Sequence, residues 1–256
     1  ISYMVCEYLD GQTLDKLRSS SADERLEEQL ILHVAAEVCA GLIAIHRNGF
    51  VHRDIKPSNV MVMITGVRIG AGAGTNWSAG SGAGAGSAAG SGSGSGSGSG
   101  LPSVRIMDFG IAKSTTKELN RFNTTTGGGQ AGTPPFMSRA AHQGLLDQRN
   151  DLWALGMTML LCALGRIPKD LAFGAPVPVG EMRGHGFTEP FIRVVTKSMR
   201  NELDDGFQSA DKMHEALVEL TRVKTGVTTL KKQVKQLLQG QQRVQEKQQQ
   251  IHDTVE

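Results

Sequence analysis

The sequence has few of the features that mark a secreted, membrane-spanning or nucleic-acid-binding protein. Only three of its 256 residues are cysteines, and Cys6, Cys39 and Cys162 are scattered and set in apolar surroundings. They are typical of reduced core residues rather than of a disulfide framework. A formal net charge of +2 is too small to indicate binding to nucleic acid or to an acidic membrane surface. We therefore expect neither partner, and an intracellular, cytoplasmic location.

Long apolar runs are also lacking. No signal peptide is visible, and the longest apolar run, Leu152 to Gly165, is too short to cross a bilayer. We expect a buried core helix there and no membrane association. The chain does not begin with Met: it opens on Ile1 within a strand-like pattern, which we interpret as a fragment or a truncated gene model.

Hydrophobic periodicity predicts helices and short strands along the ordinary part of the chain. In chain order we expect a strand over Ile1–Leu9 ended by the turn Asp10–Gln12, and then a short helix that follows Thr13 and runs through Arg18. A long amphipathic helix from Asp23 to Asn48 with Gly49 as its C-cap comes next, followed by strands over Val60–Ile64 and Val104–Met107. Between these last two strands, residues 66–102 are mostly Gly, Ser and Ala. Such a segment cannot bury enough apolar surface to order itself, so we expect a disordered insert; a binding element around Trp77 is the alternative.

Apolar residues near the end of the chain recur at alternating steps of three and four over residues 220–256. This heptad seam predicts a coiled-coil helix, and its β-branched a positions favour a two-stranded assembly, either a homodimer or a pair with a partner helix. The alternative is a solvated single helix or a disordered Gln-rich tail, which Gly226 and Gly240 favour.

Two polar motifs lie at the ends of predicted strands. In "FVHRDIKPSNV" the side chains of Asp54, Lys56 and Asn59 fall within six positions, which fits either a solvated turn or a loop that holds charge at fixed points. In "VRIMDFGIAK" a strand runs into Asp108. Two carboxylates and an amide on strand-adjacent loops suit a divalent cation such as Mg²⁺ held against a polyphosphate, which favours the second interpretation.

These motifs resemble those of the eukaryotic-type protein kinase family. "HRDIKPSN" resembles the catalytic loop and "DFG" the metal-binding motif, and they stand in the family's order. Lys56, two residues past Asp54, and the "GT" of Gly132–Thr133 are typical of the serine/threonine type. The resemblance implies an α+β fold: a protein-kinase-like large lobe, mainly α-helical with short β-strands around the catalytic loop, before the coiled-coil helix.

The resemblance also implies a domain organisation. It covers Ile1 to Leu220: residues 1–12 correspond to the last small-lobe strand and the hinge, and residues 13–220 to the large lobe, with the insert inside it. Residues 221–256 form the expected coiled-coil helix.

The implied activity is that of an enzyme, a serine/threonine kinase that transfers the γ-phosphoryl group of ATP to protein Ser and Thr hydroxyls, with Mg²⁺ as cofactor. By position in the motifs, Asp54 would accept or orient the proton of the substrate hydroxyl, and Lys56 would neutralise charge on the γ-phosphoryl group. Asn59 and Asp108 would hold Mg²⁺.

The stretch "MVCEYLDGQTL" resembles the family's hinge. Cys6 would stand at the gatekeeper position, the backbone of Glu7 and Leu9 would bind adenine, and Met61 would form the floor of the adenine pocket. Cys6 and Met61 fit the core of the fold equally well under a purely structural interpretation.

Two further stretches resemble supporting elements. Asp151 in "DLWALG" resembles the buried helix-start Asp that braces the backbone of the catalytic loop. Arg53 and the threonines Thr124, Thr125 and Thr126 suggest a segment that phosphorylation could order through pairing with Arg, although a merely polar segment fits as well.

The sequence departs from the family in two places. No G-x-G-x-x-G stands before Asp54, and the small lobe with its Gly-rich loop and phosphate-pairing Lys would lie before the hinge, so we expect this chain alone to bind ATP weakly and to be inactive. In addition, Ala140 and Gly206 stand where the family carries a Glu and an Arg that form a buried ion pair. Losing both partners of such a pair can be nearly neutral. These departures favour the alternative of a non-catalytic pseudokinase or scaffold that assembles through the coiled coil.

Overall fold

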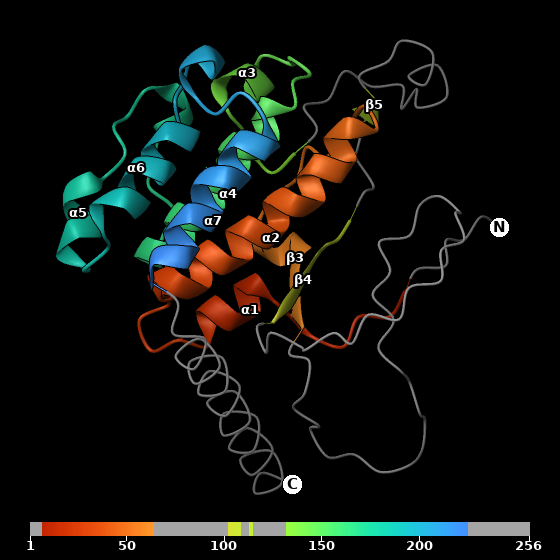
Figure 1. Ribbon diagram of the computed structural model, residues 1–256. Helices are drawn as coiled ribbons and strands as arrows, with labels where there is room; N and C mark the ends of the chain where they lie inside the picture. Colours follow the sequence, from red (N-terminus) through yellow and green to blue (C-terminus); the bar gives the residue numbers. More distant parts are fainter. Residues whose placement is uncertain (1–6, 64–101, 109–112, 115–131, 225–256) are drawn as a thin grey trace, which may run out of the picture.

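The computed structural model describes residues 7–63, 102–108, 113–114 and 132–224. Within these ranges the protein is mainly α-helical with short strands (Figure 1). The α-helices are α1 (Leu14–Ser19), α2 (Glu28–Arg47), α3 (Arg139–His142), α4 (Arg149–Leu164), α5 (Val179–Gly184), α6 (Glu189–Ser198) and α7 (Ala210–Lys224). Single turns of 3-10 helix form η1 (Pro57–Asn59), η3 (Pro134–Phe136), η4 (Leu171–Phe173) and η5 (Leu203–Asp205). The strands are β1 (Gln12–Thr13), β2 (Phe50–Val51), β3 (Val60–Met63), β4 (Ser103–Ile106) and β5 (Lys113–Ser114).

Helix α2 is the central element of the lobe, since α7, α4, β4 and β2 pack against it. Figure 1 shows α7 lying alongside α2, with α4 to α6 on one side and the strands β3 and β4 on the other. By length and composition α2 could cross a membrane, but its apolar residues face α7, α4 and β4 inside the fold. Its buried apolar positions include Leu30, Val34, Val38 and Leu42, as the periodicity predicts. After α2, Gly49 adopts φ 74°, the left-handed conformation expected of a residue that ends a helix.

The predicted start of this helix at Asp23 is wrong by more than one turn, because α2 begins at Glu28. The preceding residues form a turn in which Glu24 has φ 56°. The N–H of Leu26 donates to the carbonyl oxygen of Cys162 in α4 at 2.8 Å, and the Leu26 side chain is buried. A tertiary contact therefore takes the amide that a longer helix would have used.

Helix α4 confirms the prediction of a core helix in the apolar run from Leu152 to Gly165. The side chains from Asn150 to Leu164 are buried. The helix ends at Gly165, which has φ 72° and approaches the Asp23 carbonyl so closely that a Cβ would lie 2.9 Å from its oxygen. Cys162 in this helix and Cys39 in α2 are free and buried, and burial raises the pKa of the Cys162 thiol to about 12. Both fit the predicted role of reduced core residues.

The strands form a three-stranded antiparallel sheet in the order β1–β3–β4. The strands predicted over Val60–Ile64 and Val104–Met107 are confirmed as β3 and β4, each within one residue of its predicted bounds. Of the turn predicted over Asp10–Gln12, Gly11 forms a bend, but Gln12 already belongs to β1 and pairs with Val62 of β3. Gly11 makes this approach possible: a Cβ there would lie only 2.6 Å from the Val62 carbonyl oxygen.

Three further predictions meet the limits of the described residues. Of the strand predicted over Ile1–Leu9, Glu7–Leu9 are described and form no strand. The insert falls in residues 64–101, outside the described part, but Pro102 is buried and its carbonyl oxygen accepts a hydrogen bond from His33 Nε2 at 2.7 Å. The seam from residue 225 onward, and with it the coiled coil, also lies outside. Helix α7 continues past the predicted boundary at residue 220, and Leu220 packs against the core.

The contact between α4 and α6 gives a test of packing. A Cβ added to Gly156 would lie 2.9 Å from both Ser198 Cβ and Met199 Cγ. We expect Gly156→Ala to lower the free energy of unfolding by about 1–3 kcal/mol, because overpacking forces the two helices apart. Chemical denaturation measures this change. Gly180→Ala in α5 is the matched control, since a Cβ there meets no atom within 4 Å, and a loss as large as that of Gly156→Ala would contradict the packing argument.

Candidate active site

The loop His52–Asn59, which carries the sequence HRDIKPSN, is held at both ends by secondary structure. Before it, β2 pairs antiparallel with β5. At its other end, the last three residues of the loop form η1, which leads directly into β3. Pro57 stands at the start of η1, where its missing N–H costs no helical hydrogen bond and its fixed φ favours the turn. The short polar loop is therefore positioned by the strands on either side of it.

The carboxylate of Asp54 is the centre of a buried cluster of hydrogen bonds. Its Oδ1 accepts from Thr133 Oγ1 at 2.7 Å. Its Oδ2 lies 2.7 Å from Lys56 Nζ and accepts from Asn59 Nδ2 at 2.9 Å. Lys56 Nζ also donates to Thr133 Oγ1 at 2.7 Å, so the ammonium contacts both partners. These contacts hold the Asp54 carboxylate in one orientation.

The same contacts determine the charge of Asp54. Burial by itself would raise the pKa of this carboxyl group, but hydrogen bonds from Lys56, Thr133 and Asn59 and the positive charge of Lys56 outweigh it. The pKa of Asp54 therefore lies below its usual value of 3.8. Since donors that bind the ionised form favour it, Asp54 is a carboxylate at neutral pH.

The sequence pattern gave Thr133 only as part of a type signature, and the structure gives it a contact at the centre of the site. Gly132 adopts φ 131°, and a Cβ at that position would lie 3.0 Å from the Arg53 carbonyl oxygen. The close approach of Gly132 to the loop brings the next residue, Thr133, within hydrogen-bonding distance of Asp54. The signal that could have identified Thr133 was the "GT" pair itself.

Asp151, in the first turn of α4, braces the loop from behind, as predicted. Its side chain is 1% exposed. Asp151 Oδ2 accepts from the backbone N–H of His52 at 2.9 Å, and Oδ1 accepts from that of Arg53 at 2.8 Å. Oδ2 also lies 2.8 Å from His46 Nε2, a contact from α2 that the sequence did not indicate. Asp151 thus ties α4, α2 and the loop together.

Arg53 and His52 show how tightly the backbone is specified here. Arg53 has φ 74°, a left-handed conformation that typically costs 1–3 kcal/mol outside glycine and is retained only where surrounding contacts enforce it. His52 is fully buried; its Nδ1 accepts from the N–H of Asp54 at 3.3 Å, and its Nε2 donates to the Met107 carbonyl oxygen at 3.1 Å. Both bonds are satisfied when the ring carries its proton on Nε2.

Asp108 lies beside this loop through its neighbour Met107. The N–H of Met107 donates to the Asn59 carbonyl oxygen at 2.8 Å, and the Met107 carbonyl accepts from His52. Asp108 follows directly, with an exposed side chain and φ 61°. The structure therefore brings together the two motifs that the sequence analysis paired.

The donor set fits a magnesium site of the kind that phosphates complete. Asn59 donates through Nδ2 to the backbone oxygen and to Oδ2 of Asp54, so its amide oxygen is the atom that could ligate a cation. The Asp108 carboxylate supplies a charged oxygen. In the described part of the chain, no group of three or more His, Cys, Asp or Glu side chains could hold a metal ion by itself. Mg²⁺ is commonly bound by one or two carboxylates with substrate phosphates and water, which this set allows.

The predicted adenine site is only partly described. Cys6 lies outside the described residues. Glu7 is exposed and Leu9 half-buried in a stretch without secondary structure, before β1. Met61 is half-buried in β3, where it pairs with Thr13 and Arg105. The structure therefore tests neither the hinge contacts nor the floor of the pocket, and both stay predictions.

The two positions that depart from the family pattern, Ala140 and Gly206, both lie within the described residues. Ala140 is buried in α3, and Gly206 is half-buried after η5. The methyl group of Ala140 carries no charge, and Gly206 has no side chain. The threonines at residues 124–126 lie outside the described residues, so their phosphorylation stays a hypothesis.

Comparison with known families defines the class of protein. The model of the protein kinase domain matches residues 2–176, more than half of the chain. The chain therefore belongs to the protein kinase family, as its motifs indicated.

Similar proteins include several named as serine/threonine-protein kinases. A probable serine/threonine-protein kinase of Clostridium acetobutylicum is 28% identical over 171 residues, which cover 66% of this chain and 20% of that protein. The serine/threonine-protein kinase PknB of Mycobacterium leprae is 25% identical over 231 residues, 86% of this chain and 30% of the relative. The serine/threonine-protein kinase Pkn1 of Myxococcus xanthus is 30% identical over 167 residues, which cover 65% of this chain and 18% of that protein. The chain thus spans less than a third of the length of these relatives.

The contact between Lys56 and Asp54 predicts a pH-dependent loss of stability. We expect Lys56→Met to lower the free energy of unfolding by roughly 1–3 kcal/mol at neutral pH, because a buried carboxylate loses a charged hydrogen bond. The folded-state pKa of Asp54 is depressed, so its contribution is present above the unfolded-state value and is lost as pH falls through the folded-state pKa. The variant should therefore differ from wild type most at neutral pH and least in acid. Chemical denaturation from pH 7 down to about pH 3, just below the unfolded-state value, measures this.

Lys212→Met provides the control for this experiment. Lys212 pairs with Glu215 on the surface, where both side chains are exposed. We expect no measurable change in stability at any of these pH values, since surface pairs contribute little. Equal behaviour of the two variants would show that Lys56 does not stabilise the Asp54 carboxylate.

Proposed function

We propose that this chain is part of the catalytic domain of a serine/threonine protein kinase, which transfers the γ-phosphoryl group of ATP to Ser and Thr hydroxyls of protein substrates. The observation that carries the proposal is the Asp54 carboxylate, with one oxygen on Thr133 and the other on Lys56 and Asn59. Phosphoryl transfer depends mainly on positioning and charge, and this cluster supplies both.

Asp54 is the residue that would act on the substrate hydroxyl. Its low pKa means that it is a weak base, so its main role is to orient the attacking oxygen and to accept the proton late in the transfer. The Lys56 ammonium group contacts the Asp54 carboxylate. During transfer this positively charged group can stabilise the negative charge of the γ-phosphoryl group. The Thr133 hydroxyl donates to Asp54 and accepts from Lys56, and so fixes the positions of both side chains.

Mg²⁺ and ATP are the cofactors that this site would use. Asn59 and Asp108 are the proposed ligands of Mg²⁺, through an amide oxygen and a carboxylate on loops that Met107 joins. Bound Mg²⁺ would neutralise the phosphates. Adenine would contact the backbone of Glu7 and Leu9 and the side chains of Cys6 and Met61, as the hinge motif suggests.

The partners and location follow from the same proposal. A protein with accessible Ser or Thr is the substrate, and the heptad pattern over residues 220–256 supports pairing with a second copy or a partner helix. We further propose an intracellular location, because Cys39 and Cys162 are free and buried, as in proteins of reducing compartments.

A second candidate is a non-catalytic pseudokinase or scaffold. The observation that favours it is the uncharged pair Ala140 and Gly206, which relaxes a requirement that we infer for catalytic members. Binding of Mg-ATP by the complete gene product separates the two: a ligand that binds the folded state raises the melting temperature, and no shift at millimolar Mg-ATP would favour the scaffold.

Substitution of Asp54 tests the catalytic proposal in the complete gene product. We expect Asp54→Asn to lower kcat by at least 100-fold, because the amide cannot accept the proton of the substrate hydroxyl. Transfer of labelled phosphate from ATP to a Ser- and Thr-containing protein measures this change. The amide is isosteric, so the fold and the binding of Mg-ATP should persist.

Asp205→Asn is the matched control, because Asp205 is an exposed carboxylate in η5. We expect wild-type activity from it. If Asp54→Asn retained more than a tenth of the activity, Asp54 would not be the group that acts on the hydroxyl.

A further inference from the structure

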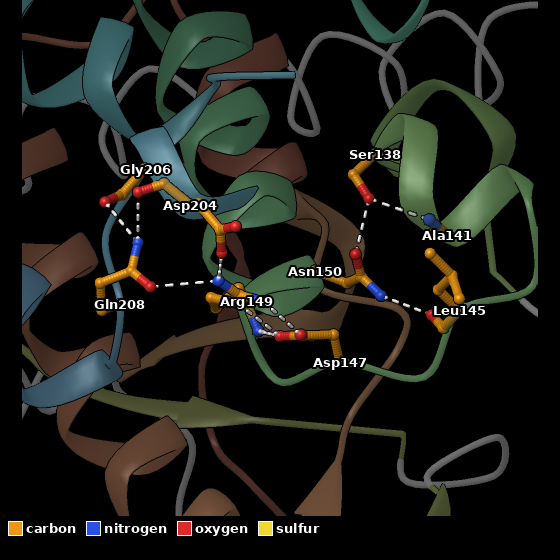
Figure 2. Close-up of polar contacts among 9 residues, drawn as sticks. All are labelled: Ser138, Ala141, Leu145, Asp147, Arg149, Asn150, Asp204, Gly206 and Gln208. Atoms are coloured by element: carbon orange, nitrogen blue, oxygen red, sulfur yellow. Dashed lines mark hydrogen bonds and ion pairs between the residues drawn. The ribbon is translucent and has the colours of Figure 1, made fainter. Parts of the chain in front are cut away.

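Three consecutive residues at the start of α4 each hold a different part of the lobe. Arg149 reaches toward η5, Asn150 toward the segment before α3, and Asp151 toward the HRDIKPSN loop. Figure 2 shows the first two sets of contacts side by side. One helical turn thus connects elements that are remote in the sequence.

The contacts of Asn150 are buried and use both ends of its amide. Asn150 is 9% exposed and Ser138 is 1% exposed. The Ser138 hydroxyl donates to Asn150 Oδ1 at 2.6 Å, and Asn150 Nδ2 donates to the Leu145 carbonyl oxygen at 2.8 Å (Figure 2). The same hydroxyl accepts from the N–H of Ala141 at 3.0 Å and so caps α3. Removal of either side chain would leave buried polar groups without their partners, which is costly.

The contacts of Arg149 are more numerous but lie nearer to solvent. Arg149 binds the Asp147 carboxylate through Nε and Nη2, and its Nη1 contacts Asp204 at 2.6 Å and Gln208 at 3.1 Å. The Asp204 side chain is 93% exposed. Exposed ion pairs contribute little, so the Arg149–Asp204 contact cannot carry the connection that Asn150 makes in the interior.

The buried contacts form a closed path that begins and ends at Asp54. The Asp54 carboxylate accepts from Thr133, and five residues later Ser138 donates to Asn150. The residue after Asn150 is Asp151, which accepts from the backbone amides of His52 and Arg53, just before Asp54. The first turn of α4 therefore helps to position both the side chain of Asp54, through Thr133 and Ser138, and the backbone that precedes it.

We propose that Asn150 is a positioning residue for phosphoryl transfer: by holding Ser138 on the first turn of α4 it keeps Thr133 on the Asp54 carboxylate. This inference rests on the proposed function. Asn150 touches neither substrate nor cofactor and acts through the short segment from Thr133 to Ser138. The buried hydrogen bond between the Asn150 amide and the Ser138 hydroxyl fixes this segment. Ala140, two residues after Ser138, has no charged group that could do so through an ion pair.

The test is a set of kinetic measurements on the complete gene product. We expect Asn150→Ala and Ser138→Ala each to lower kcat by about 10- to 100-fold, because misplacement of a positioned group by ~1 Å has effects of this size. The KM for ATP should stay unchanged. Ser138→Ala is the milder variant and keeps the test valid if Asn150→Ala does not fold. Assays run well below the melting temperature of each variant, so lower stability alone would leave kcat at its wild-type value and would overturn the proposal.

A double-mutant cycle with Thr133→Val sharpens the result. If Ser138 and Thr133 act on Asp54 along one path, the kcat of the double variant should be close to that of Thr133→Val alone. Independent effects that multiply would overturn the proposal. Asp204→Asn is the control and should keep wild-type kcat; a loss as large as that of Ser138→Ala would assign the positioning to the exposed network instead and overturn the role of Asn150.

Hydrogen exchange supplies a measurement that needs no activity. The amides of Phe136 and Met137 donate to the carbonyls of Thr133 and Pro134 at 2.8 and 3.1 Å. In Ser138→Ala these two amides should exchange faster, while they should be unchanged in Asp204→Asn. Unchanged exchange in Ser138→Ala would overturn the positioning path. Faster exchange in a protein that transfers no phosphate would reject the proposed function and leave the structural connection supported.

Discussion

The interaction on which the rest of the structure depends is the acceptance of the His52 and Arg53 amides by the buried carboxylate of Asp151. A buried charge is tolerated only when donors surround it, and here two backbone N–H groups and His46 do so. In return, the carboxylate holds Arg53 at a φ that is unfavourable for an arginine. That backbone geometry determines where Asp54 emerges from the loop, so the buried charge of Asp151 positions the carboxylate of the candidate active site.

The main helices could be predicted from the sequence because their burial is periodic. The positions of Leu30 and Val38 in α2 follow directly from apolar spacing, and the apolar run of α4 needs no periodicity because the whole helix is buried. What periodicity could not give is the start of α2, since the Leu26 amide is used by Cys162 in another helix. The strand at Gln12 was likewise concealed, because a two-residue strand next to Gly11 looks like a turn until its partner is known.

The site could be predicted where its residues are close in sequence or end a strand. Asp54, Lys56 and Asn59 lie within six positions, and their mutual contacts are local. Thr133 and His46 reach their partners across 79 and 105 residues. Asn150 contacts Ser138 across only 12 residues, but through a turn whose course the sequence does not reveal. None of these three contacts leaves a periodic pattern, and only the family motif pointed toward Thr133.

The pairing of Met63 with Ser103 at the end of the β3–β4 ladder places the exit and the return of the chain side by side. Partners in an antiparallel ladder have Cα atoms only about 5 Å apart, so whatever joins them need not span the lobe. The hydrogen bonds of the β3–β4 ladder, and the one between Pro102 and His33 of α2, are made entirely by residues of the lobe. This end of the β3–β4 ladder is therefore a natural place to graft a fluorescent or affinity module whose own termini are adjacent.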